Sequence, residues 1–499
     1  MKKNNINDTL KSPRLPVAVL CFIPLLSVIA AHCLNITDEA NVMFLMRCAI
    51  LCVGLCAVAD AYKGRLTSEK IIFLLLFIGV IMRCGYTVYT HAFTRSHDIG
   101  VNNETGVGHW GYINHVMNGR LPPSNEYQFY QPPFYYMISS LFIRIAMIFT
   151  GSRKWSDFMF MAQTVSCTAS VIGLITLPAV MNKLNIKKSA QIIPVAVTAL
   201  YPVQFMTAGS MNNDALVFMF MMLSLYSTLL WARERRLKYI IFIALSTGFG
   251  MMTKINCGVT ALITGPIMLY FLFTGICSGK RCELKSLIFQ LCVFAVIVFP
   301  LGLWYPIRNL ILFDQPLNYV HILGTNSFVY TGDASWYDRW LNIPFFDFIK
   351  NPYTDMGSDT SIWMLLIKTG VHGEWSFDWL APAAAWLIEY VHAAVILMTV
   401  ISAVFSVIRL KGNKAAVYSS GAVWGLMTIL YIMFNIQYPY SCSADFRYML
   451  LWQVSGAALT GIFAEYLKNT GNKLSVCAYN TICVLTASFC ILSVIHFCR

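Results

Sequence analysis

The sequence predicts an all-α, polytopic membrane protein, and three observations support this. Of its 499 residues, 57% are hydrophobic and only 12% are charged, whereas a soluble globular domain carries roughly 25% charged residues. The mean hydropathy is +0.61. The apolar runs are about 20 residues long and do not alternate apolar with polar residues, which favours membrane-spanning helices over the strands of a barrel.

The apolar runs are separated by polar or basic loops. They cover residues 15–33, 41–59, 70–90, 131–150, 157–181, 190–209, 213–232, 238–252, 255–277, 286–304, 383–408, 415–435, 446–466 and 475–497. The first two belong to residues 1–68, which we interpret as a two-helix extension. Residues 69–499 then form one membrane domain.

The basic loops predict the orientation, because Lys and Arg favour the cytoplasmic side of short loops. The loops expected inside lie near residues 63–70, 233–238, 280–285, 409–414 and 468–473. Two long polar loops, 91–130 and 305–382, are then outside. Both are expected to carry short helices that lie on the membrane surface.

One basic loop, at residues 183–188, conflicts with simple counting. It is inside only if residues 131–181 make an odd number of net crossings, yet this segment holds two apolar runs. We therefore expect 131–150 to be re-entrant or to lie along the membrane, which gives about 13 crossings. The net charge of +13 is explained by these loops and does not indicate a nucleic-acid partner.

The first outer loop concentrates residues that can carry chemistry. Asp98 follows the run 70–90 closely, so it lies near the membrane surface. There its carboxylate can act as a general base or be a solvated loop acid. Glu104 has the same two interpretations. Residues 107–118 have the spacing of a short surface helix, which Gly-Arg-Leu-Pro-Pro ends, and Gln-Pro-Pro-Phe-Tyr-Tyr from Gln131 opens the next helix.

Further charged residues lie at predicted outer ends of later spans. Asp214 follows two Asn residues and can be a helix cap or a site residue. Lys254 interrupts the apolar stretch at a predicted outer turn. Arg308 and Arg447 can hold a phosphate or anchor to lipid headgroups.

The order of these motifs resembles the GT-C glycosyltransferases. The similarity is carried by the first-loop acid, Gly-Arg-Leu-Pro, Gln-Pro-Pro-Phe-Tyr-Tyr, Asn-Asn-Asp, Trp-Tyr-Pro-Ile-Arg-Asn and Asp-Phe-Arg-Tyr. It is strongest to the branch that holds the protein O-mannosyltransferases and the aminoarabinose transferase of lipid A. It covers roughly residues 70–497 and implies the GT-C fold.

The resemblance implies transfer of a sugar from a polyprenyl-phosphate donor to a hydroxyl of a lipid, polysaccharide or protein on the extracytoplasmic face of the cell membrane. Asp98 is then the base of an inverting reaction, with Glu104 beside it. Basic residues hold the leaving phosphate. The residues expected to contact substrate are His97, His109, Gln131, Tyr135, Asp214, Lys254, Arg308, Arg447 and Tyr448. No cofactor is expected, and a divalent cation is possible but not favoured.

The chain departs from this family at Gln131. Several members have Lys before the Pro-Pro pair, where it helps to bind the lipid phosphate, and Gln cannot supply that charge. Two alternatives to a GT-C transferase stay open. A transporter or flippase of lipid-linked sugars is one, although the internal repeats typical of transporters are not seen. An O-antigen ligase or polymerase is the other, and would depend on His321 or His372 instead of Asp98.

Overall fold

The computed structural model describes residues 14–100, 106–125, 127–277, 281–377, 382–410 and 412–498. Within these ranges the regular elements are all helices, with no strand and one isolated bridge between Tyr330 and Tyr440. The all-α prediction is confirmed. Glu104 lies outside the described residues.

Every predicted apolar run falls on a helix or on two consecutive helices. In chain order these are α2 (Arg14–Cys33), α3 (Glu39–Tyr62), α4 (Ser68–Tyr89), α6 (Phe134–Thr150), α7 (Phe160–Lys183), α8 (Lys188–Leu200), α9 (Pro202–Gly209), α10 (Asp214–Glu234), α11 (Leu237–Thr253), α12 (Ala261–Cys277), α13 (Arg281–Phe313), α17 (Pro382–Arg409), α18 (Lys414–Gln437), α19 (Leu450–Thr470) and α20 (Lys473–Phe497). The pattern of a polytopic helical protein is therefore confirmed.

The number of crossings differs from the expected count. Within the described residues, nine helices are long and apolar enough to cross a membrane, or ten if the bent pair α8–α9 forms one span. Other apolar helices, such as α6 and α11, have only 17 residues, where a span needs about 20. The count of about 13 is thus not confirmed.

Shorter helices occupy the loops, as predicted for both outer regions. They are α5 (Gly108–Met117), η1 (Tyr127–Tyr130), η2 (Trp155–Phe158), η3 (Ile255–Thr260), α14 (Trp336–Trp340), α15 (Asp347–Lys350), α16 (Ile362–His372), η4 (Ser441–Ala444) and η5 (Phe446–Met449). α5 matches the helix predicted over residues 107–118, and α6 begins directly after the Pro-Pro pair.

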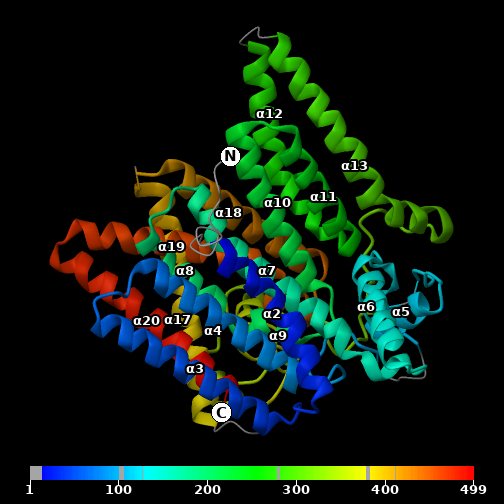
Figure 1. Ribbon diagram of the computed structural model, residues 1–499, viewed down its shortest axis with the longest axis horizontal. Coiled ribbons are helices and arrows are strands. Elements are labelled where there is room, and N and C mark those ends of the chain that lie inside the picture. The colour runs from blue at the N-terminus through cyan, green and yellow to red at the C-terminus, as the bar shows by residue number, and fades with distance from the viewer. Residues whose placement is uncertain are drawn as a thin grey trace, which may run out of the picture.

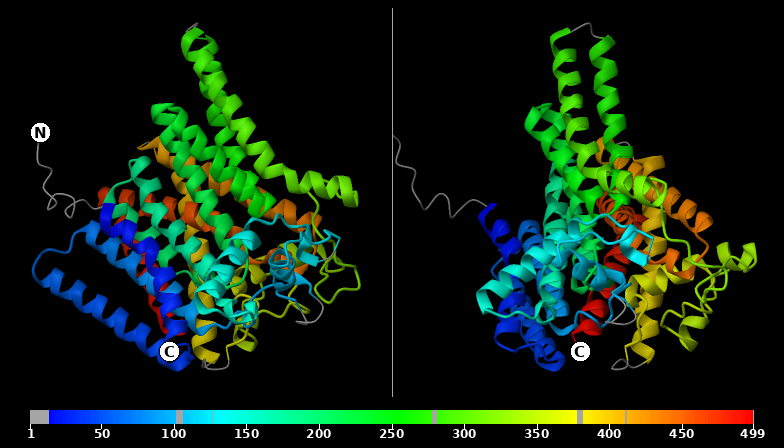
Figure 2. Two further views of the ribbon diagram at one scale, coloured as in Figure 1. Left: turned by 45° about the vertical axis from the view of Figure 1, so that its right-hand side comes forward. Right: turned by 90° about the vertical axis from the view of Figure 1, so that its right-hand side faces the viewer.

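Figures 1 and 2 show how the helices are arranged. α12 and α13 form a hairpin that extends beyond the remaining helices, and α5 and α6 lie together at one edge. α2 packs against α4 and α7, and α3 packs against α4. At the start of α3, Glu39 Oε1 lies 3.6 Å from the Arg95 guanidinium. The two N-terminal helices therefore touch both the bundle and the first polar loop.

A buried arginine stabilises the bend between α8 and α9. The two helices meet at 45°, because Pro202 has no amide hydrogen and cannot continue α8. The bend leaves carbonyls without helical partners. Arg83 of α4, which is 0% exposed, donates to Thr198 O at 3.1 Å and to Ala199 O at 2.8 Å. This assigns a structural role to Arg83, whose partner the sequence did not identify.

Loops predicted to be cytoplasmic contact one another at one end of the bundle. Lys188 Nζ lies 3.7 Å from Glu69 Oε1, and Lys187 Nζ lies 3.4 Å from Glu465 Oε1. Asn413 donates to Leu184 O at 2.9 Å. The basic loop 183–188 therefore lies on the same side as the other basic loops, which agrees with the predicted orientation.

Contacts at the start of α6 bear on the crossing conflict. Tyr135 at the start of α6 donates to Ala162 O at the start of α7, over 3.1 Å. Trp155 in the connection between the two helices stacks on Trp110 of α5, with ring centroids 4.6 Å apart. After α6, the chain thus returns to the level in the bundle at which α6 began. From that level α7 then crosses the bundle. This supports the interpretation that 131–150 makes no net crossing.

Candidate active site

A cavity of about 330 Å³ lies where the first polar loop meets the ends of α10, α11 and α19. Its polar end includes Asp98, His109, Gln131, Asn213, Asp214, Lys254, Arg447 and Tyr448. Its apolar end includes Val217, Phe218, Met221, Met427, Leu430 and Leu451. Charged groups and an apolar wall are thus parts of one cavity, to which seven of the residues predicted from the sequence contribute.

Asp98 is placed by an unusual backbone conformation. Its φ is +54°, in the left-handed region that non-glycine residues seldom adopt. The Asp98 carbonyl accepts the amide hydrogen of His109 at 2.9 Å, so the loop closes onto the start of α5. Gly108 permits this approach, because a Cβ there would lie 2.5 Å from Asp98 O. The result is a carboxylate, one-third exposed, that lines the cavity.

Arg447 lies among three carboxylates. Its guanidinium is 3.7 Å from Asp98 Oδ2, 3.8 Å from Asp214 Oδ2 and 3.6 Å from Asp445 Oδ2. These distances exceed those of hydrogen bonds, so the guanidinium is held there by electrostatic attraction and not by hydrogen bonds to these carboxylates. Its side chain is only 6% exposed. Arg447 is therefore a buried cation whose donors are available to an anion in the cavity.

Lys254 supplies a second cation on the opposite side of Asp214. It ends α11 in an extended conformation, and its Nζ lies 2.5 Å from Asp214 Oδ1. Both cations approach the Tyr448 ring, Lys254 at 5.2 Å and Arg447 at 5.1 Å from its centroid. Two cations thus lie close together, against one shared acid and one shared aromatic ring.

Gln131 and Asn213 form a neutral part of the wall. The Asn213 amide donates to Gln131 Oε1 and to Thr253 O, the latter at 3.1 Å. Thr253 directly precedes Lys254. Gln131 has no charge, but Lys254 brings a positive charge to the same cavity.

His109 faces the cavity as an uncharged ring. It is 1% exposed, and its Nδ1 lies 2.7 Å from the Tyr136 hydroxyl. Burial lowers the pKa of His109 to about 4, although Asp98 and Asp214 oppose the shift. The imidazole is thus a neutral hydrogen-bonding group near pH 7.

Three predicted site residues do not line the cavity. Tyr135 is buried and donates to Ala162 O at 3.1 Å, which is a packing role. Arg308 donates to Pro122 O at 3.1 Å and to Asn309 Oδ1 at 2.9 Å, and stacks over Tyr305. This placement argues against a phosphate contact by Arg308, because its N–H groups already donate to Pro122 O in the first loop and to the neighbouring Asn309 side chain. The structure brings Asn309, its neighbour, to the cavity instead.

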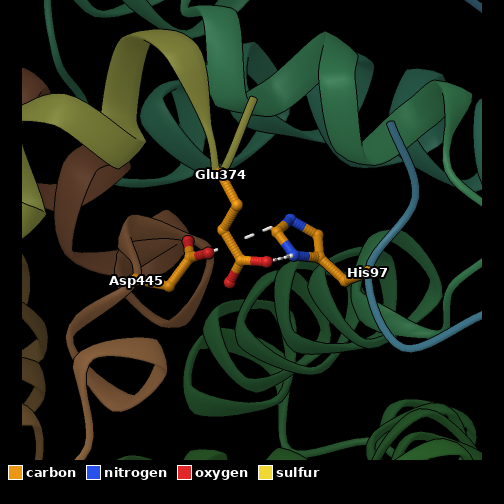
Figure 3. Close-up of side chains that lie close together, drawn as sticks. All are labelled: His97, Glu374 and Asp445. Atoms are coloured by element: carbon orange, nitrogen blue, oxygen red, sulfur yellow. Dashed lines mark ion pairs between the residues drawn. The ribbon is translucent and has the colours of Figure 1, made fainter. Parts of the chain in front are cut away.

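His97, the third, lies behind the cavity wall with two acids that the sequence did not single out. Its Nδ1 is 2.9 Å from Glu374 Oε2, and its Nε2 is 3.9 Å from Asp445 Oδ2, as Figure 3 shows. Burial disfavours the imidazolium, but the charges of Glu374 and Asp445 and the interaction with the Glu374 carboxylate together outweigh it and raise the pKa of His97. Burial also opposes ionisation of Glu374, yet His97 lowers the pKa of Glu374 to about 2. Burial raises the pKa of Asp445 despite the nearby Arg447.

The histidines that an O-antigen ligase would need are not at the cavity. His372 is 0% exposed, and its Nδ1 lies 3.1 Å from Glu389 Oε1 in the interior. Neither His372 nor His321 is among the described residues that line the cavity. The site therefore does not favour that alternative.

A second cavity, of about 420 Å³, continues the apolar end of the first. It lies among α7, α10, α12, α18 and α19, and shares Leu451 with the first cavity. Its lining includes Leu225, Leu229, Leu262 and Val423. Leu451 thus borders both the cavity that holds the charged group and an apolar cavity within the helix bundle.

Comparison with known proteins bears on what such a site does. Residues 130–304 match the family described as dolichyl-phosphate-mannose-protein mannosyltransferase. This match covers about a third of the chain, so it shows a similarity of that segment to a family of membrane glycosyltransferases. The matched segment holds Gln131, Asp214 and Lys254. Asp98 and Arg447 lie outside it.

Two solved structures are similar to the chain. The apo oligosaccharyltransferase of Archaeoglobus fulgidus is 14% identical with a TM-score of 0.47, and the similarity covers 86% of this chain and 56% of that one. Apo ArnT from Cupriavidus metallidurans is 13% identical with a TM-score of 0.34, over 80% of this chain and 78% of that one. The chain thus spans little more than half of the oligosaccharyltransferase. No curated protein matches the sequence.

Proposed function

We propose that this protein transfers a sugar from a polyprenyl-phosphate donor to an acceptor hydroxyl on the extracytoplasmic face of the cell membrane, with inversion. One observation carries the proposal. Asp98, Lys254 and Arg447 share a cavity with an apolar wall, and a second apolar cavity in the bundle adjoins it at Leu451. A soluble sugar nucleotide needs no such wall, whereas a prenyl chain does.

The charged group suits a departing phosphate. The acceptor O–H attacks the anomeric carbon, the bond from that carbon to the phosphate oxygen breaks, and the electron pair stays on the phosphate. Lys254 and Arg447 then stabilise the charge that develops on this oxygen, which is a large catalytic effect in a site shielded from water. Before the donor binds, Asp214 contacts both cations, Lys254 Nζ at 2.5 Å and the Arg447 guanidinium at 3.8 Å, and so holds them on the cavity.

Asp98 is suited to receive the acceptor proton. Its carboxylate is at the cavity and partly exposed, so an acceptor can approach it from outside. When the donor phosphate binds Arg447, the attraction between Arg447 and Asp98 weakens, and Asp98 becomes the stronger base. Donor binding would therefore prepare the base for the acceptor.

The orientation follows from the basic loops. Lys187, Lys188 and Asn413 gather at one end of the bundle, and basic loops favour the cytoplasm. The cavity is bordered by the polar loops predicted outside. The proposed reaction therefore takes place on the extracytoplasmic side, where the donor must carry its sugar on a lipid.

Mass spectrometry of lipids bound to the purified wild-type and Asp98→Asn proteins tests the proposal. We expect a glycosyl polyprenyl phosphate in both, converted to the free polyprenyl phosphate only by the wild type when acceptor extract is added. Tyr135→Phe is a matched control, because Tyr135 does not line the cavity. If both proteins hold the lipid and neither consumes it, a transporter of lipid-linked sugars replaces the transferase.

A further inference from the structure

His97, Glu374 and Asp445 come from three separate loops and converge on one point. His97 follows α4, Glu374 follows α16, and Asp445 precedes α19. One ligand atom from each lies within 4.8 Å of the other two. Figure 3 shows the imidazole and both carboxylates turned toward the same small space. No sequence spacing predicts this group, because 277 and 71 residues separate its members along the chain.

Two side-chain atoms of this group have no hydrogen-bond partner among the described residues. Asp445 Oδ1 accepts the Arg447 amide hydrogen at 2.8 Å, but Asp445 Oδ2 accepts no hydrogen bond. His97 Nδ1 also has none, although Glu374 Oε2 is only 2.9 Å away. Asp445 is 1% exposed and His97 8% exposed. Buried polar atoms without partners are costly, and here they face one another.

The local charge is also unbalanced. Four carboxylates (Asp98, Asp214, Glu374 and Asp445) surround only two permanent cations, Arg447 and Lys254. A histidine that binds a metal must give up its proton, and with His97 neutral two negative charges are left. A divalent cation cancels this excess, whereas a monovalent cation does not.

We propose that His97, Glu374 and Asp445 bind a divalent transition-metal cation. One imidazole nitrogen and two carboxylate oxygens are ligands that Zn²⁺ and Mn²⁺ accept, whereas Mg²⁺ prefers oxygen ligands alone. Ligand bonds of about 2.0–2.2 Å require the three loops to close slightly around the ion. Three protein ligands leave further positions for water or a substrate oxygen.

The ion would fix the geometry of the neighbouring cavity. His97 directly precedes Asp98, and Asp445 lies two residues before Arg447. Joining the three loops through one ion therefore holds the base and the phosphate-binding cation at a set separation. The three ligands are positioning residues, and binding of the ion does not depend on the proposed sugar transfer.

Calorimetry on chelator-treated protein in detergent, with Zn²⁺ alone and with Mn²⁺ alone, tests the proposal. We expect about one equivalent bound by the wild type, and binding at least about tenfold weaker in His97→Ala and Glu374→Gln. His91→Ala is the matched control, because His91 lies in the same loop, is exposed and is outside the group. It should bind like the wild type. No saturable binding by the wild type, or equal binding by all four proteins, overturns the proposal.

A spectrum of the wild type with Co²⁺ avoids dependence on variants that fold poorly. The chain has 16 cysteines, so a metal could also bind through thiolates. We expect only weak visible bands from nitrogen and oxygen ligands. An intense thiolate charge-transfer band would place the ion on cysteines and overturn the assignment. Both experiments use no donor or acceptor, so their failure is distinct from failure of the transferase proposal.

Discussion

Lys254 Nζ lies 2.5 Å from Asp214 Oδ1, on a cavity whose wall also carries the neutral Gln131. Lys254 reaches this place because α11 ends at Thr253 and the next residue is extended. The α11–η3 connection therefore brings a positive charge to the same cavity as Gln131. Under the proposed function, Lys254 is the residue on which binding of the donor phosphate most directly depends.

Lys254→Met should raise the donor KM about 10- to 100-fold, the worth of one charged hydrogen bond. Lys254→Arg should recover much of the loss, because it restores the cation. The measurement is donor titration with a glycosyl polyprenyl phosphate at saturating acceptor. An unchanged donor KM in Lys254→Met would remove this residue from the phosphate site.

Asp98→Asn should lower kcat roughly 10²- to 10⁴-fold, the usual contribution of a general base. The amide keeps the shape of the carboxylate but cannot accept the proton. The thermal unfolding midpoint should change little, because no hydrogen bond within the described residues depends on the charge of the Asp98 side chain. Wild-type turnover in this variant would rule out Asp98 as the base.

Arg447 and Arg308 should behave differently, although the sequence predicts the same role for both. Arg447→Gln should impair donor use as strongly as Lys254→Met, because Arg447 lines the cavity. Arg308→Ala should leave the donor KM unchanged, because its donors serve Pro122 O and Asn309 Oδ1. Donor titration of both variants decides between them. A raised donor KM in Arg308→Ala would restore the sequence-based expectation.

The difference between these two arginines shows what the sequence could predict. Hydropathy located every long apolar helix of the described residues but not the shorter α16. Motif order brought Asp98, Asp214, Lys254 and Arg447 together as site residues, because helix ends on one side of a membrane lie at the same level. The sequence could not predict toward which side of α13 the Arg308 side chain points. Nor could it find Glu374 and Asp445 beside His97, since irregular loops have no periodicity from which to infer contacts.

Arg83→Leu should destabilise the fold by about 2–5 kcal/mol. It leaves the carbonyls of Thr198 and Ala199 unpaired at the α8–α9 bend, and each unsatisfied buried group costs about 1–3 kcal/mol. The free energy of unfolding can be measured by titration with a denaturing detergent. Arg144→Leu is the control, because Arg144 is exposed and bonds only Met117 O among the described residues. An equal, small effect of both substitutions would contradict the structural role of Arg83.

His109 should make stability depend on pH in one direction. Its pKa is about 4 in the folded protein, against about 6.5 in an unfolded chain. Between these values the unfolded state binds more protons, so the free energy of unfolding falls as pH falls from 6.5 toward 4. The loss is on the order of 3 kcal/mol, and above pH 6.5 it is absent.

His109→Gln removes this dependence while keeping a polar side chain beside Tyr136. The variant should be less stable than the wild type at pH 7.5, because its bond to the Tyr136 hydroxyl is altered. The deficit should shrink at pH 5, since only the wild type loses stability through His109. Unfolding by a denaturing detergent at both pH values measures the deficit, and exposed His91→Gln should show none at either. A deficit that stays constant between the two pH values would mean that the folded protein does not hold His109 neutral.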